Sequence, residues 1–290
     1  MKIVTTQLHP RYLGLQLAAS KVLDHENIIM WQPNSTPIFD VLDEIKPDVV
    51  FCDIKFVNST FMRAFSEYSH VKTVLFNEAV PHDLVPDAVV AKPSTSPVIR
   101  KHIESDKWNT VYCKDSADIC SYWGGQVEEN LACDIGYLSV GTDPEKLKNK
   151  MIWISEILKK DPGVLRVLGS ARMPLPQYLG TIKENKVSSF LKSAKIILDY
   201  DEDVMLNGAA NGACVFSTVP NRLFPSVDSS SIEGLLKGKK RDKIARKAQK
   251  LVLAQDTCYH RFAEVMEAIG AKDEAQEALK QLEELTCEQV

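Results

Sequence analysis

The sequence lacks any apolar run approaching the roughly 20 residues that a membrane-spanning helix needs. Its start holds one lysine and a two-residue apolar stretch, so we expect no secretory signal there. A strong charge of either sign is also missing, since 35 Lys and Arg residues oppose 39 Asp and Glu residues and leave a net charge of -4. No overall basic field attracts nucleic acid or an anionic membrane, although a local basic groove remains open.

Cysteine pairing signals are missing too. The seven cysteines are odd in number and form no Cys-x-x-Cys pair and no zinc-like spacing with histidine. Cys52 and Cys214 lie in apolar, strand-like runs, where a thiol usually fills the core. We therefore expect an intracellular, cytoplasmic protein without structural metal or disulfide. With 13 Gly, 14 Pro and 26% charged residues, collagen-like and disordered classes are excluded.

The 290 residues indicate about two domains. In the first part, short apolar runs alternate with stretches of helical period. Strands are predicted at 2–6, 27–31, 48–52, 71–76 and 87–91, and helices at 10–23, 37–45, 58–68 and 94–103. This alternation predicts βαβ units on a parallel sheet.

The same alternation restarts after an irregular stretch that ends in Trp123-Gly124-Gly125. Strands are predicted at 134–140, 164–168, 195–198 and 213–217, and helices at 144–160, 186–193, from near Asn207, at 229–236 and over most of 241–290. The fold class is therefore α/β with two Rossmann-like domains. The predicted domains are 1–125 and 126–270, followed by a C-terminal helix at 271–290.

Four motifs follow one another in the second half. They are VLRVLGS, then QYLGTI before VSSFLKSAKIILDYD, then DVMLNGAANGACVFST, and finally TCYHRFAEVMEAIG. In this order they resemble the C-terminal domain of GT-B glycosyltransferases, especially the glycosyltransferase family 1 group that includes the CgeB-like proteins. The resemblance covers 164–269. It implies two Rossmann-like domains facing across a cleft, with the last helix crossing back.

The residues of the segment LNGAANGACV are of a kind that can bind phosphate, apart from any resemblance. Gly208 permits close backbone approach, and a helix beginning near Asn207 would direct free N–H groups, Ala209 among them, at a diphosphate. The alternative is a tight helix–sheet contact without a ligand. Where this chain has Asn207, many family members have a glutamate that binds the donor's ribose hydroxyls, and the missing charge leaves the nucleotide's identity open.

Further donor-binding residues are predicted at strand ends. Gly169, Ser170 and Arg172 follow a strand at the carboxyl edge where open α/β sheets bind ligands. Arg172 would stabilise the leaving diphosphate, unless it is an ordinary surface arginine. Gly180 and Ile182 stand where the resemblance implies that the nucleobase is read.

The acceptor side is expected on the first domain. Asp53 and Glu78 follow predicted strands, and His82 lies just beyond. An inverting transferase needs a carboxylate or histidine there as general base. The alternative is that the acidic residues cap the helices that follow.

Two charged clusters remain. The acidic residues between 199 and 203 resemble the metal-binding D-x-D of a different glycosyltransferase architecture, but the surrounding motifs favour a solvated loop and a metal-independent enzyme without a cofactor. The run KGKKRDKIARKAQK at 237–250 is either a solvated face or a contact with nucleic acid.

The resemblance implies a hexosyl- or pentosyltransferase that uses a nucleoside-diphosphate sugar. The acceptor is unknown, and one candidate is a hydroxymethylated base in phage duplex DNA, in which case the protein would work in the host cytoplasm. Two alternatives stay open: a nucleotide-sugar-binding protein without catalysis, and a nucleotide-sugar epimerase. Retention or inversion of configuration is not decided by the sequence.

Overall fold

The computed structural model describes residues 1–9, 12–76, 85–91, 109–139, 152, 155–156, 159, 165–169, 177–199, 201–217, 221, 223–225 and 239–287. The chain forms two compact units. The first unit comprises Met1–Lys114 together with Cys258–Val290, and the second comprises Asp115–Thr257. The sequence placed the corresponding boundaries near 125 and 270.

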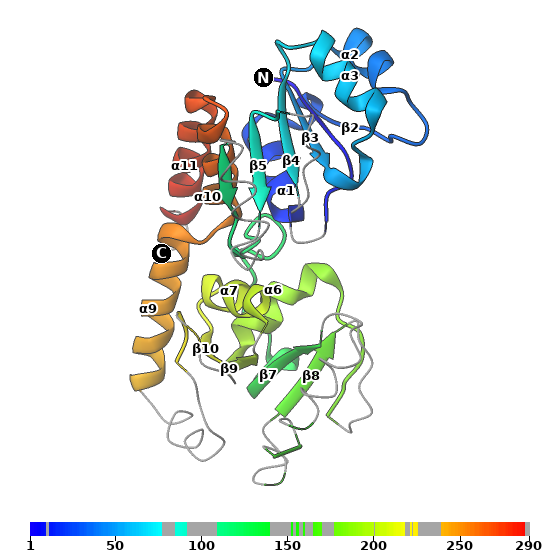
Figure 1. The fold of residues 1–290 in the computed structure, drawn as a ribbon. Coiled ribbons are helices and arrows are strands. Elements are labelled where there is room, and N and C mark those ends of the chain that lie inside the picture. The colour runs from blue at the N-terminus through cyan, green and yellow to red at the C-terminus, as the bar shows by residue number, and fades with distance from the viewer. Residues whose placement is uncertain are drawn as a thin grey trace. The chain divides into compact units, whose positions relative to one another are not determined.

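The sheet of the first unit has six parallel strands in the order β2-β1-β3-β4-β5-β6 (Figure 1). The strands are β1 (Ile3–Thr5), β2 (Ile28–Met30), β3 (Val49–Asp53), β4 (Lys72–Phe76), β5 (Ala88–Ala91) and β6 (Thr110–Tyr112). The chain turns from one direction along the sheet to the other between β1 and β3. Open α/β sheets bind ligands at the carboxyl ends of strands at such a point.

Helices cover both faces of this sheet. On one face, α2 (Ile38–Ile45) and α3 (Ser59–Glu67) pack on alternate strand residues in a core that includes Val4, Val50 and Leu75. On the other face lie Phe51 and Phe76, whose rings pack edge to face with a centroid separation of 5.3 Å. Successive strand residues point to opposite faces, which explains why the predicted β3 run is apolar throughout.

The C-terminal part of the chain returns to the first unit. Helix α1 (Leu13–Val22) contacts α10 (Cys258–Ala268), and α10 also contacts β5 and β6 (Figure 1). Helix α11 (Lys272–Cys287) packs on α10 and α1. The return of the last helices to the first unit confirms the expectation that the C-terminal helix crosses back.

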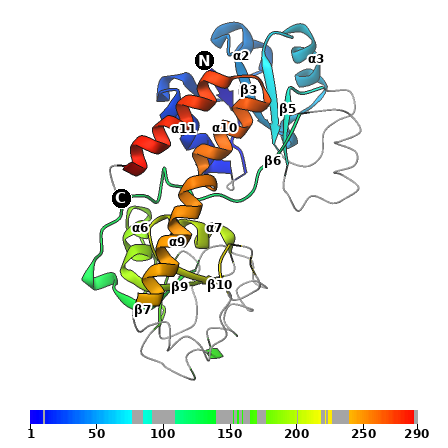
Figure 2. The same ribbon diagram turned by 90° about the vertical axis from the view of Figure 1, so that its left-hand side faces the viewer.

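The second unit has four parallel strands in the order β10-β9-β7-β8. They are β7 (Cys133–Ser139), β8 (Leu165–Gly169), β9 (Ala194–Asp199) and β10 (Cys214–Ser217). Helices α6 (Glu184–Ser193) and α7 (Glu202–Ala210) pack on this sheet, and α9 (Lys239–Gln255) runs beside α7 and β10 (Figure 2). Here the chain changes direction along the sheet between β7 and β9, so both units have the predicted α/β fold on a parallel sheet.

Candidate functional site

Two predicted donor-site glycines lie together at the carboxyl edge of the second sheet. Gly169 ends β8, and its N–H donates to the carbonyl oxygen of Gly180 over 3.2 Å. Both residues have positive φ, 143° and 110°, a conformation that glycine adopts easily. A side chain built at Gly180 would meet no atom within 4 Å, so this backbone is open to close approach.

The segment before α6 is held against β8 by main-chain bonds. Val167 accepts the N–H of Leu179 over 2.9 Å, and the half-buried Tyr178 donates its hydroxyl to the Gly169 carbonyl over 2.9 Å. Ile182 is half-buried, and α6 begins at Glu184 with no side-chain hydrogen bond from its N-cap residue. The positive end of the α6 dipole therefore begins four residues after the open glycine, with the acidic Glu184 in its first turn.

The prediction that a helix begins near Asn207 is wrong. Helix α7 begins at Glu202, after Asp201 in the N-cap position, and Asn207 lies in its C-terminal half. Amides this far into a helix are used in main-chain bonds to residues four positions earlier, and the dipole there is negative rather than positive. The first turn itself carries Glu202 and Asp203, which would oppose a phosphate.

Gly208 and Ala209 serve packing in this structure. A side chain at Gly208 would lie 3.1 Å from Cγ2 of Val215 on β10, and Ala209 is fully buried. The small residues let α7 approach β9 and β10 closely, as the alternative interpretation of this motif held.

Asn207 and Asn211 fix the segment that opens the second unit. The Asn207 side-chain oxygen accepts the N–H of Asp118 over 2.7 Å. Asn211, which is 5% exposed, donates its side-chain amide to the carbonyl oxygens of Asn207, over 2.9 Å, and of Tyr122. The carboxamide at 207 is thus engaged with the chain's own backbone, a role the sequence did not reveal.

The sequence also missed a pair at the start of α6. Tyr122 hydrogen-bonds Glu184, and burial together with the charges of Glu184 and Asp118 raises the pKa of the phenol. Burial raises the pKa of Asp118 as well, although its carboxylate accepts the N–H of Ser121 over 3.1 Å. No spacing signal joins residues so far apart in the sequence.

In the first unit, the strand ends form a polar network. Asp53 ends β3, is 3% exposed, and donates its N–H to the Thr6 hydroxyl over 3.0 Å. Its carboxylate accepts the N–H of Lys55 over 3.1 Å and so caps the short helix η3 (Ile54–Phe56). Gln16 of α1 donates to Thr5 Oγ1 over 2.7 Å and to the Thr6 carbonyl over 3.0 Å. In this structure Asp53 therefore caps the helix that follows it, as the alternative interpretation of this residue held.

Four predicted site residues lie outside the described residues. They are Glu78 and His82 of the acceptor side and Ser170 and Arg172 of the donor side. Their roles stay predictions.

The acidic residues at 199–203 are not one solvated loop. Asp199 is fully buried at the end of β9, and its Oδ1 accepts the N–H of Asp201 over 3.0 Å. Asp203 is exposed and Glu202 is half-buried. An acidic first turn favours the helix that it opens.

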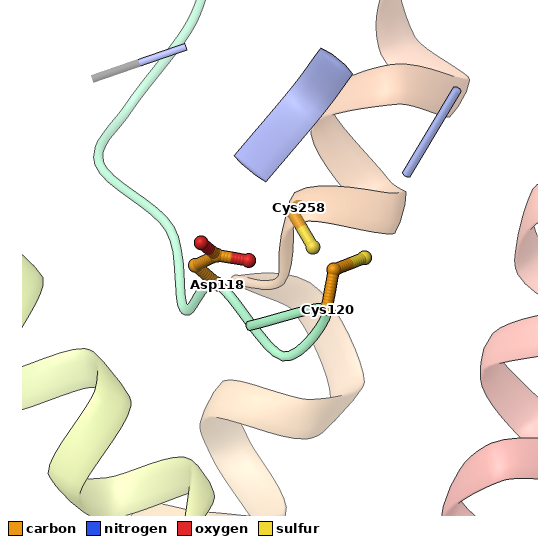
Figure 3. A group of neighbouring side chains, drawn as sticks. All are labelled: Asp118, Cys120 and Cys258. Carbon is orange, nitrogen blue, oxygen red and sulfur yellow. The ribbon is translucent and has the colours of Figure 1, made fainter. Parts of the chain in front are cut away.

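Figure 3 draws the side chains of Asp118, Cys120 and Cys258. Asp118 and Cys120 belong to the second unit, whereas Cys258 is the first residue of the C-terminal segment of the first unit. No site is assigned to this group.

Solved structures with similar folds cover nearly the whole chain. HepE from Anabaena, in complex with UDP, has a TM-score of 0.61 and 13% identity, covering 93% of this chain and 100% of its own. An alpha-glucosyltransferase in complex with UDP and a DNA 13-mer has a TM-score of 0.62 and 9% identity, covering 93% of this chain and 99% of its own. The chain has the GT-B fold.

A third similar structure is a protein described as a UDP-N-acetylglucosamine 2-epimerase, from Listeria monocytogenes. Its TM-score is 0.50 at 10% identity, over 95% of this chain and 94% of its own. No protein-family model and no curated protein matches the sequence. Identities this low establish the GT-B fold and leave the CgeB-like subgroup a prediction. Among the described helices, none is both long and apolar enough to cross a bilayer.

Proposed function

We propose that the protein is a glycosyltransferase that transfers a sugar from a nucleoside-diphosphate sugar to an acceptor hydroxyl. The observation that carries this proposal is the likeness of both α/β units, over more than nine tenths of the chain, to proteins solved with UDP. The second unit would bind the donor, and the first would bind the acceptor.

The donor phosphates belong, in this proposal, beside Gly169, Gly180 and the start of α6. This edge offers an open glycine backbone and a helix N-terminus whose first turn carries one acidic residue, Glu184, bonded to Tyr122, whereas the first turn of α7 carries two. Ser170 and Arg172 follow Gly169 in the sequence and would neutralise the leaving diphosphate without a metal. Asp53, Glu78 and His82 remain the candidates for the general base.

UDP binding to wild type and to two matched glycine variants tests the donor site. Gly180 and Gly270 both have positive φ, and neither has an atom within 4 Å of an added Cβ, so alanine strains both backbones alike. We expect UDP to raise the melting temperature of wild type and Gly270→Ala, but to bind Gly180→Ala about tenfold more weakly. Equal UDP affinities of the two variants would remove Gly180 from the site, and no UDP binding by wild type would remove the donor proposal.

We propose duplex DNA as the molecule that carries the acceptor hydroxyl, because one surface of the second unit suits its phosphates. Lys240, Lys243, Lys247 and Lys250 are exposed on α9 and recur at helical spacing, so they form one stripe. Among the described residues these four lysines have no ion-pair partner, while Arg241 pairs with Asp242 over 3.0 Å. Such a stripe on a chain with a net charge of -4 is complementary to phosphates.

A filter-binding titration in several salt concentrations tests the DNA proposal. Lys243→Glu/Lys247→Glu should weaken duplex binding about tenfold or more and reduce the salt slope by about 2, because each phosphate contact contributes about 0.9. Lys21→Glu/Lys272→Glu, on α1 and α11, makes the same change in net charge away from the stripe and should bind like wild type. Wild type without salt-dependent affinity for duplex DNA, modified or unmodified, would end this proposal.

Epimerisation is the second candidate function, and the likeness to the Listeria protein favours it. Acceptor dependence separates the two activities. A transferase releases nucleoside diphosphate only slowly without an acceptor, whereas an epimerase converts the nucleotide sugar with none. Product analysis with the purified protein and several nucleotide sugars decides between them, and no turnover despite UDP binding would indicate a binding protein.

A further inference from the structure

A hollow of about 570 Å³ opens in the first unit beside the carboxyl end of β1. It is bounded by α1, by the end of β1 and by the edge strand β2. Binding cavities for small molecules usually measure about 300–1,000 Å³ and lie at the carboxyl ends of such strands. The hollow belongs entirely to the first unit, and the donor site proposed above is in the second.

The hollow exists because α1 covers only part of its sheet face. Leu15, Ala18 and Ala19 of α1 are buried, whereas Leu13 on its other flank is 48% exposed. That second flank, which recurs at helical spacing, lines the hollow with Leu13, Gln16, Leu17 and Ser20. Opposite it stands Met30 of β2, which is 57% exposed. β2 is the edge strand of its sheet, so no strand continues beyond it.

The lining is apolar with a few neutral polar groups. Its hydrophobic part comes from α1, from β2 and from the residues that follow β1 and β2: Leu8, Leu13, Leu17, Ile28, Met30 and Trp31. Three glutamines border the hollow, of which Gln7 and Gln32 are exposed. The side-chain amide of Gln16 donates to Thr5 and Thr6, and neither of those hydrogen bonds uses its side-chain carbonyl oxygen.

Charge is what this lining lacks. Among the described residues that border the hollow, none is an Asp, Glu, Lys or Arg, and His25 is the titratable one. A charged ligand would lose hydration there without gaining an opposite charge. Carboxamides both donate and accept, so they match hydroxyl or amide groups on a ligand that is otherwise apolar.

We propose that this hollow, named here the α1–β2 site, binds an uncharged amphipathic small molecule that carries hydroxyl groups. Rings or methylene groups of the ligand contact Leu13, Leu17 and Met30, and its hydroxyl groups bond the glutamine amides. The site does not require the transferase activity. If the transferase uses a small acceptor rather than DNA, this ligand class is the class of that acceptor.

Calorimetric titration of the full chain with two matched probes tests the α1–β2 site. The probes are 2-naphthol, which is uncharged at neutral pH, and 2-naphthalenesulfonate, which has the same rings and a fixed negative charge. We expect wild type to bind 2-naphthol at least about tenfold more tightly than the sulfonate. Saturating UDP should leave both affinities unchanged, which separates this result from the outcome of the donor-site experiment.

Variants then locate the binding. Met30→Lys places a cation at the exposed rim, so it should weaken 2-naphthol about tenfold and strengthen the sulfonate. Ser20→Leu fills space at a buried lining position and should weaken both probes. Val127→Lys alters an exposed valine of the second unit, 66% exposed, and should bind like wild type.

Three results would overturn the proposal: no binding of 2-naphthol, equal binding of the two probes, or unchanged binding by Met30→Lys. Circular dichroism establishes that each variant is folded. Because Met30 is exposed, its replacement keeps the test valid even where Ser20→Leu fails to fold.

Discussion

At the level of single residues, the second unit needs glycine at two positions where any side chain would collide with a neighbouring element. A Cβ at Gly125 would lie 2.4 Å from the Ser188 carbonyl carbon and from the Ser189 nitrogen, both backbone atoms of α6. A Cβ at Gly136, in the middle of β7, would lie 2.8 Å from Cβ of Ala194. Backbone atoms of a packed helix cannot yield locally, so an added methyl group must separate whole elements.

Gly125→Ala should therefore destabilise the second unit by about 2–3 kcal/mol. Urea denaturation, with hydrogen exchange of the α6 amides to assign the loss to this unit, measures the effect. Gln126→Ala, at the exposed neighbouring position, should change the free energy of unfolding by less than about 0.5 kcal/mol. An equal stability of Gly125→Ala and wild type would mean that the segment does not pack on α6 as described.

The cysteines also differ residue by residue. Burial raises the pKa of the Cys214 thiol to about 12 and that of Cys133 to about 11. Burial and the neighbouring Asp53 charge raise the pKa of Cys52 as well. Cys287, by contrast, is exposed.

Alkylation at pH 8 should therefore modify Cys287 first. A raised pKa keeps the thiol protonated, and only the thiolate reacts, so Cys52 and Cys214 should resist iodoacetamide until the pH is raised much further or the chain is unfolded. Peptide mass spectrometry over time gives the order. Early labelling of Cys214 in folded protein would contradict its burial on β10.

At the level of elements, α7 does more than cover the sheet. Its C-terminal end holds the segment that opens the second unit, through Asn207 with Asp118 and Asn211 with Tyr122. That segment also contacts the start of α6, where Tyr122 bonds Glu184. The C-terminal end of α7 thus holds a segment that also contacts the start of α6.

Asn211→Ala should release this segment. The substitution removes a buried donor and leaves the Tyr122 carbonyl without its bond, a loss of about 1–3 kcal/mol. Limited proteolysis should then cleave within 115–125 several times faster than in wild type. Asn130→Ala, at an exposed position of the same unit, should be cleaved at the wild-type rate. If Asn211→Ala resisted proteolysis within 115–125 as well as wild type, other contacts would be what keeps this segment in place.

At the level of the whole molecule, the first unit is discontinuous in sequence. Phe262, Val265 and Met266 of α10 are fully buried within it. Their burial is worth roughly 5–9 kcal/mol, at about 1.5–3 kcal/mol each. That amount matches the whole stability of a typical domain.

A chain truncated after Thr257 should accordingly lose the folded first unit but keep the second. Hydrogen exchange should find β1, β3 and β4 unprotected and β7 and β9 protected. Adding a peptide of residues 258–290 should restore part of the protection. If the truncated chain kept β3 protected, the C-terminal helices would be accessory to the first unit.

The sequence alone determined the α/β class, the parallel strands and the order of the elements. Apolar runs such as residues 49–52 and the helical period of α2 record burial within a single segment, so they can be read locally. Gly169 was also predicted to lie at the carboxyl edge, because it follows a strand. Gly180 was predicted from the resemblance, and its bond to Gly169 was found only in the structure.

Only the tertiary structure decided what depends on partners distant in sequence. The packing of Gly208 against Val215, the bond from the Asp53 N–H to the Thr6 hydroxyl and the Tyr122–Glu184 pair each involve contacts that no local period records. The α1–β2 hollow is of the same kind, since it depends on how far α1 extends over a neighbouring strand. A pattern along the chain fixes which face of a segment is buried, whereas the partner that buries it is chosen by packing in three dimensions.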